Sequence, residues 1–100
     1  MNIDLCLFKG GVRRAITMSF EDGKVFDVPL AELFDKYGFK GTFHLNSANL
    51  NKETYLTDDQ VRQIGKNHEI SVHGKTHPFL DKIPLTFVVD EIMEDKKALE

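Results

Sequence analysis

Apolar residues along the chain occur in two patterns. Some form short runs, and others recur every three or four residues over longer stretches. Short apolar or alternating runs that end in glycine or polar residues predict β-strands. They lie at residues 3–8, 15–20, 41–45 and 69–73. Because Gly10-Gly11 separates the first two runs, we expect these to pair as an N-terminal β-hairpin.

Longer stretches between the later runs place apolar residues three or four positions apart, which predicts helices. Their apolar stripes are formed by Leu30, Leu33, Phe34 and Tyr37 in the first, and by Leu85, Val88, Ile92 and Leu99 in the last. Thr57 and Gln60 predict a capping box for a middle helix that should run to about Asn67.

The ends of the outer helices also carry cap signals. Asp27 and Thr86 are candidate N-caps, and Gly38 suits the position after the end of the first helix. From residue 15 onward strands and helices alternate, which predicts right-handed βαβ units and a parallel sheet. The predicted class is α/β, with about three βα units where a closed barrel needs about eight.

Composition narrows the classes of protein that the chain can represent. Ten aromatic residues favour a packed core over disorder, and 13 basic against 16 acidic residues give no nucleic-acid footprint. No apolar run exceeds four residues, which excludes a membrane span, and Cys6 alone excludes disulfides and cysteine-rich metal sites. No signal peptide is visible at Met1, so the cytoplasm is the default location, with the envelope or secretion expected if a leader is missing.

Two groups of polar residues stand where predicted strands end. Glu21 and Asp22 follow one strand, and His73 and His77 follow another. Ligands of parallel α/β sheets bind at the carboxyl ends of the strands, so one carboxylate and two imidazoles can meet there. This donor set is typical of a catalytic zinc or a non-haem iron, with positions left open for water and substrate. A second carboxylate, Glu21, would then be placed to take a proton from that water.

Ordinary structural roles compete with this interpretation. Two histidines four residues apart are common by chance, and an Asp-Gly turn is ordinary. Their coincidence at two strand ends of one sheet favours the metal site. We expect His44 to be packed or hydrogen-bonded within its strand, and His68 to contribute a favourable charge at a helix C-terminus.

Three segments resemble the polysaccharide deacetylase family, the NodB-homology carbohydrate esterases. Residues 16–23 resemble its first motif, usually Thr-Phe-Asp-Asp-Gly, and residues 41–45 resemble its second strand. The segment from His68 to Pro78, with His73 and His77 as its paired histidines, resembles its His-x-x-x-His-Pro motif. Order and spacing agree from about Arg13 to Glu100.

The resemblance implies an irregular (β/α) barrel and removal of N- or O-acetyl groups from carbohydrates such as N-acetylglucosamine polymers. It implies Asp22, His73 and His77 as ligands of a divalent metal ion, zinc in the first instance, with cobalt, iron or nickel as alternatives. Glu21 stands where the family has its general-base aspartate. The family's later motifs would follow residue 100, so we expect residues 1–100 to be the N-terminal part of a single, incomplete domain of this type.

One further position departs from the family pattern. Gly74 replaces a common serine or threonine after the first histidine, and the hydroxyl of Thr76 is a candidate substitute for bracing the loop.

Three functional hypotheses remain open. The first is a metal-dependent carbohydrate deacetylase. The second is a non-catalytic metal- or glycan-binding remnant without the family's later motifs, and the third is a plain α/β module whose histidines have no chemical role. We expect an acetylated carbohydrate as partner, no nucleic acid, and self-association through the apolar inner face of an open sheet.

Overall fold

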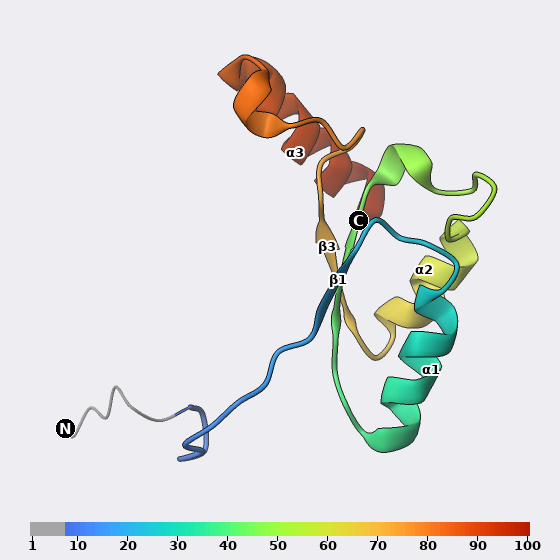
Figure 1. Ribbon diagram of the computed structural model, residues 1–100, viewed down its shortest axis with the longest axis vertical. Helices are drawn as coiled ribbons and strands as arrows, with labels where there is room; N and C mark the ends of the chain where they lie inside the picture. The colour runs from blue at the N-terminus through green and yellow to red at the C-terminus, as the bar shows by residue number, and fades with distance from the viewer. Residues whose placement is uncertain (1–7) are drawn as a thin grey trace.

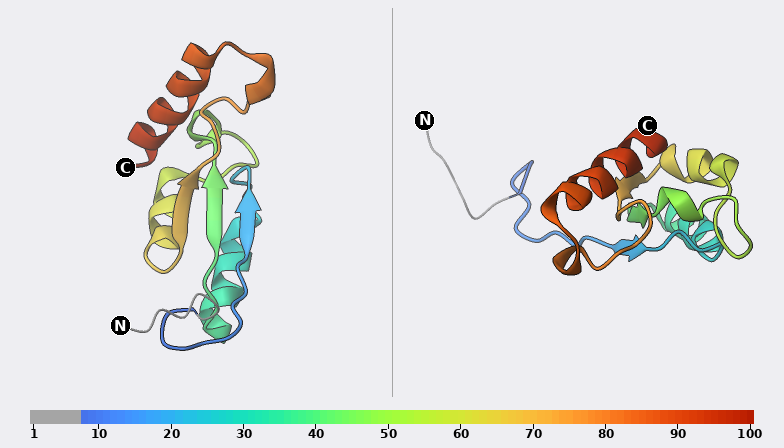
Figure 2. Two further views of the ribbon diagram at one scale, coloured as in Figure 1. Left: turned by 90° about the vertical axis from the view of Figure 1, so that its left-hand side faces the viewer. Right: turned by 90° about the horizontal axis from the view of Figure 1, so that it is seen from above.

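Parallel strands form the centre of the molecule, whose computed structural model describes residues 8–100. The strands are β1 (Ser19–Glu21), β2 (Thr42–Leu45) and β3 (Glu69–Val72), and they lie side by side in that order. Phe20 pairs with Phe43, and Phe43 pairs with Ile70. The three arrows point the same way in Figure 2, so the predicted parallel α/β sheet is confirmed, and it is not closed into a barrel.

Helices cover one face of this sheet and one of its ends. α1 (Asp27–Tyr37) and α2 (Asp58–Gly65) lie together on the same side of the strands (Figure 1). α3 (Leu85–Leu99) packs against β3 and against the short 3₁₀ helix η1 (Ser47–Asn49), while a second 3₁₀ helix, η2 (Leu80–Lys82), precedes it. The other face of the strands stays largely uncovered in Figure 2.

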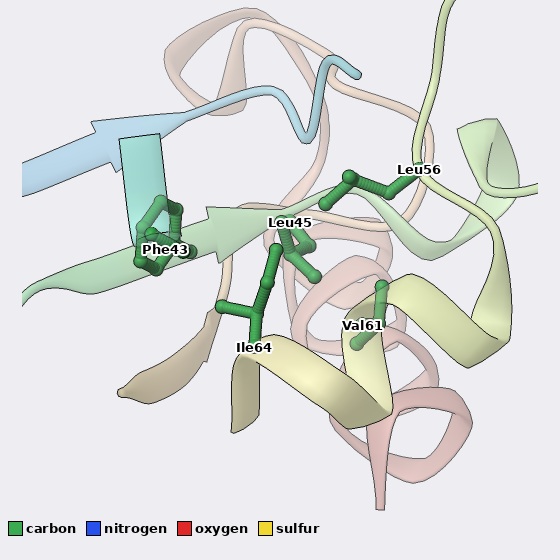
Figure 3. Packing of buried hydrophobic residues seen from close by; sticks show 6 residues of the cluster. Phe43, Leu45, Leu56, Val61 and Ile64 are labelled. Carbon is green, nitrogen blue, oxygen red and sulfur yellow. The ribbon is translucent and has the colours of Figure 1, made fainter. Parts of the chain in front are cut away.

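The hydrophobic core lies between the sheet and the two covering helices. Phe43 and Leu45 of β2 are fully buried, and Figure 3 shows them beside the side chains from α2 and the loop before it. The remaining buried apolar members of this cluster are Ala31, Leu56, Val61 and Ile64. β2 is therefore fixed by alternate side chains that point toward the helices.

The uncovered face of the sheet is polar. Strand alternation and register place on it one row of Ser19, Thr42 and Glu69 and a second row of Glu21, His44 and Ser71. The Thr42 hydroxyl donates to Glu69 Oε2 at 2.6 Å. The expectation of an apolar inner face is wrong, because the apolar residues of each strand point toward the helices.

Exposed apolar side chains gather on α3 instead. Leu85, Val89 and Met93 recur every four residues and are 77%, 52% and 57% exposed. Residues at this spacing share one side of a helix. Self-association of the chain stays a prediction. The exposed apolar surface that would drive it lies on α3 rather than on the sheet.

Helix ends follow the sequence signals at two places and differ at a third. Gly38 ends α1 with a φ of 71°, and Thr57 and Gln60 form the predicted capping box. Asp27 is the first residue of α1 rather than its N-cap, which is Phe26. The difference arises because the Asp27 N–H donates to the Lys24 carbonyl, so the chain already turns before the helix begins.

Two further element boundaries differ from prediction. Thr86 is not a cap, because α3 begins at Leu85 behind Pro84, whose carbonyl accepts the first helical bonds. The strand expected at 15–20 is shorter and shifted, since β1 extends only as far as its short partner β2. Of the predicted hairpin, the segment 3–7 lies outside the described residues. Within residues 8–100, no helix has the length and apolarity needed to cross a membrane.

Candidate metal centre

The two polar motifs lie at the same edge of the sheet. Glu21 is the last residue of β1, and His73 directly follows β3, so both motifs stand at the carboxyl ends of their strands. β2 separates the two strands. Side chains from β1 and β3 therefore reach toward one another across the end of β2.

Asp22, His73 and His77 converge. Each offers one ligand atom, and these atoms lie within 4.8 Å of one another. Asp22 Oδ1 is 3.1 Å from His77 Nε2 and 3.6 Å from His73 Nε2, and the two imidazole centroids are 4.9 Å apart. Such spacings suit three ligands around one small cation.

The Asp22 carboxylate depends on an unusual backbone turn. Asp22 has a φ of 76° and Gly23 a φ of 68°, so two successive residues adopt the left-handed region, which aspartate tolerates better than most residues do. A Cβ at Gly23 would stand 3.0 Å from Leu45 Cδ2. The turn thus rests directly on the hydrophobic core, and glycine is needed there for both conformation and space.

The loop that carries both histidines is irregular. Gly74 and His77 have φ values of 83° and 62°, so the four-residue spacing of His73 and His77 does not correspond to one turn of helix. Asn46, nearly fully buried, donates from Nδ2 to the carbonyls of His73 and Gly74 at 2.9 and 2.6 Å. Asn46, directly after β2, therefore fixes the backbone of the loop at His73 and Gly74.

Glu21 stands beside the cluster rather than within it. Its Oε2 is 3.5 Å from His73 Nε2, and its side chain is 70% exposed. The carboxylate is free to reach solvent while its neighbour Asp22 points toward the two histidines. The two adjacent acids therefore differ in their surroundings.

The other two histidines, His44 and His68, have different surroundings. His68 is buried, accepts the Gly41 N–H at Nδ1 (3.2 Å) and places Nε2 3.3 Å from Asp35 Oδ1, so it links α1 to the start of β2. His44 is half-buried on the uncovered face, with its ring centroid 6.4 Å from that of His73. His44 pairs in register with Glu21 of β1.

Burial changes the acid–base behaviour of one nearby carboxyl. Desolvation, and secondarily the charge of Asp22, raise the pKa of Asp27 from an ordinary 3.8 to about 6. Its Oδ2 is buried without a hydrogen-bond partner. Asp27 therefore keeps its proton up to about pH 6, well above the pH at which an ordinary aspartate ionises.

Asp95 of α3 is a residue that sequence reasoning missed. It is fully buried and accepts the backbone N–H groups of Ser47 and His73. The signal was present, because Asp95 falls three residues after Ile92 and four before Leu99, on the apolar stripe of its helix. An acid in such a stripe needs a buried partner.

The donors at the centre fit a divalent metal ion. Asp22 Oδ1 is buried without a hydrogen-bond partner although the side chain as a whole is 43% exposed. A buried carboxylate oxygen without a donor is costly, and a cation would offset that cost. Two imidazoles and one carboxylate are the donor types that zinc and the other late first-row metals take.

Known proteins resemble this chain in sequence and in fold. The sequence model of the polysaccharide deacetylase family matches residues 9–100. A chitin deacetylase from Arthroderma benhamiae is 30% identical over 82 residues, which cover 81% of this chain and 22% of that protein.

Two solved structures share the arrangement of strands and helices. The Streptococcus pyogenes deacetylase PplD, solved in complex with acetate, matches 88% of this chain with a TM-score of 0.83 and 17% identity. The peptidoglycan deacetylase PdaC from Bacillus subtilis matches 87% with a TM-score of 0.69 and 18% identity.

The chain covers 41% and 43% of those two structures, less than half of each. At this identity the likeness concerns the fold, an open (β/α) arrangement of the NodB type. The family match extends over both motifs that meet at the edge of the sheet. By that match, this chain belongs to the polysaccharide deacetylase family.

Proposed function

We propose that Asp22, His73 and His77 hold a divalent metal ion, zinc in the first instance, and that Glu21 is the general base of an acetyl-removing hydrolase. The observation that carries the proposal is Asp22 Oδ1, buried without a donor and facing two imidazole nitrogens at 3.1 and 3.6 Å. The proposed reaction is hydrolysis of the acetyl group of a carbohydrate polymer.

The adjacent acids Glu21 and Asp22 lie in different environments, which supports different roles for them. When bound, a divalent ion supplies a Lewis acid that polarises an acetyl carbonyl and lowers the pKa of a water molecule. Glu21, exposed and 3.5 Å from His73 Nε2, is placed to accept the proton of the attacking water at Oε2. Asp22, turned inward by its left-handed backbone, serves as a ligand instead.

An open hollow beside the two histidines supports a site for the sugar. It has a volume of about 470 Å³ and is lined by His73, His77 and Ile92, with the exposed ring of Phe79 at its side. Sugar rings present apolar CH faces that stack on aromatic side chains, while their acetyl groups reach sideways. A polymer lying over Phe79 would thus bring an acetyl group toward the histidines.

The names of the relatives guide the choice of polymer. One is a chitin deacetylase and another a peptidoglycan deacetylase, and both polymers contain N-acetylglucosamine. We therefore propose an N-acetylglucosamine-containing polymer as substrate. These polymers belong to cell walls, which supports action at the cell envelope over the cytoplasmic default.

Zinc binding and acetate release test this proposal together. Zinc uptake is measured by calorimetric titration, and acetate release is measured from N-acetylglucosamine oligomers. We expect one zinc per chain, and a loss of affinity of about 100-fold or more in Asp22→Asn, whose amide keeps the shape and tolerates the left-handed backbone. Glu21→Gln should keep the zinc and lose about 100- to 10,000-fold in rate. Asp59→Asn, an exposed acid on α2, is the matched control.

Each outcome separates one part of the proposal from the others. Wild-type chain without stoichiometric zinc would contradict the metal centre. Zinc binding with a Glu21→Gln variant as active as the wild type would contradict the general base. Zinc and oligomer binding without acetate release would instead favour the non-catalytic binding role.

A further inference from the structure

Two acids of α3 face the loop that carries His73 and His77. Glu91 and Asp95 lie one helical turn apart, so their side chains leave the helix on the same side. Neither carboxylate touches an imidazole ring in the hydrogen bonds and ion pairs of residues 8–100; both contact the backbone or the side chain of the loop between the two histidines.

Asp95 joins the ends of two strands. Its Oδ1 accepts the Ser47 N–H at 2.7 Å just after β2, and its Oδ2 accepts the His73 N–H at 3.0 Å just after β3. The carboxylate is fully buried, so water does not compete for these bonds. Bonds from N–H groups to a carboxylate are stronger than neutral ones. Asp95 thereby fixes the backbone from which the His73 side chain starts.

Glu91 holds the middle of the same loop. Its Oε2 accepts the Thr76 N–H at 2.8 Å, its Oε1 accepts the Thr76 hydroxyl at 2.7 Å, and its backbone carbonyl accepts the Lys75 N–H at 3.2 Å. Thr76 therefore supplies the bracing hydroxyl that Gly74 lacks. The bidentate contact fixes the residue directly before His77, which itself sits in the left-handed region.

We propose that Glu91 and Asp95 are positioning residues for the metal centre, acting through the loop that carries His73 and His77. The inference rests on the proposed metal-binding function. A loop with left-handed residues at 74 and 77 has no regular hydrogen-bond ladder to fix it. The two carboxylates add to the backbone bonds of the loop, where the His73 N–H is shared between the Leu45 carbonyl and Asp95 Oδ2, each at 3.0 Å. They hold one histidine at its own N–H and the other through its neighbour Thr76.

The test is the affinity and visible spectrum of Co²⁺ bound to the full chain, with folding followed separately by circular dichroism. Asp95→Asn keeps the shape but turns an amide donor toward one N–H group. We expect it to weaken Co²⁺ binding by about 10- to 100-fold and to alter the ligand-field bands, as loss of an outer-shell partner does. Asp90→Asn, an exposed acid on the same helix, should stay within about twofold of the wild type.

A second set of variants decides the question if Asp95→Asn does not fold. Thr76 is exposed, so its substitution leaves the core intact. Thr76→Val should weaken Co²⁺ binding several-fold and Thr76→Ser should restore it, while Glu91→Gln should resemble Thr76→Val. A side chain with a structural role alone would shift the unfolding midpoint and leave the affinity and spectrum of the folded chain unchanged.

Two results would overturn the inference, and they differ in what else they overturn. Folded Asp95→Asn, Glu91→Gln and Thr76→Val chains that bind Co²⁺ with wild-type affinity and spectrum would reject the positioning role alone. A wild-type chain that binds no Co²⁺ would reject the metal centre and the positioning role together.

Discussion

The two faces of the three-stranded sheet differ in role: one packs into the hydrophobic core, and the other carries polar side chains. On the face covered by α1 and α2, Phe43 and Leu45 are fully buried and make the core. On the uncovered face, their neighbours Thr42 and His44 belong to two polar rows, of which the row of His44 includes Glu21 beside the candidate metal centre. Stability and chemistry therefore occupy alternate positions of one strand, so substitutions one residue apart should affect different properties.

Replacement of Phe43 by alanine should have the largest effect on stability. The ring is fully buried and stacks against Phe20, so its loss should cost about 3–5 kcal/mol of unfolding free energy. Urea unfolding followed by circular dichroism measures this. Phe43→Leu, which keeps most of the apolar volume, is the milder companion variant. A Phe43→Ala chain as stable as the wild type would contradict the assignment of the core.

The pH dependence of stability should reveal Asp27, which lies between core and site. Its pKa is raised to about 6 in the fold, so the native state binds more protons than the unfolded chain. The contribution of Asp27 is therefore full below pH 3.8 and is lost as the pH rises to about 6. We expect this loss to amount to about 3 kcal/mol.

Comparison with Asp27→Asn isolates that contribution. The variant cannot titrate at this position, so its stability relative to the metal-free wild type should rise between pH 4 and pH 6 and stay constant above it. Urea unfolding at a series of pH values measures the difference. Parallel stability curves for the two chains would show that Asp27 does not titrate abnormally.

The smallest effect should come from the uncovered face, at the residue before Phe43. Thr42→Val keeps the β-branched shape and removes the hydroxyl that donates to Glu69 at the exposed surface. We expect a loss below about 1 kcal/mol and an unchanged zinc affinity. A loss as large as that of Phe43→Ala would mean that the two faces do not divide stability and chemistry in this way.

Local sequence signals were sufficient for most of the fold. Gly38, Thr57 and Gln60 act within one turn of the chain, so their effect is readable from neighbouring residues. The order of strands and helices likewise follows from apolar spacing. The N-cap errors arose where a contact of the preceding turn decided the boundary, as at Lys24 and Asp27.

The candidate site was predicted in part, for a physical reason. The grouping of Asp22 with His73 and His77 follows from parallel strands ending at one edge. The left-handed backbone of Asp22 and the irregular path of the histidine loop depend on contacts with distant residues. Asp95 lies 22 residues after His73 in the chain and reaches the loop only through tertiary packing. Its position on the apolar stripe of α3 was the one local sequence signal of that role.

X-ray absorption spectroscopy of the zinc-loaded chain, compared with His77→Ala, tests the convergence of the three ligands most directly. We predict two imidazole nitrogens at about 2.0–2.1 Å from zinc in the wild type and one in the variant. A zinc environment without imidazole, or one that His77→Ala leaves unchanged, would contradict the metal centre formed by Asp22, His73 and His77.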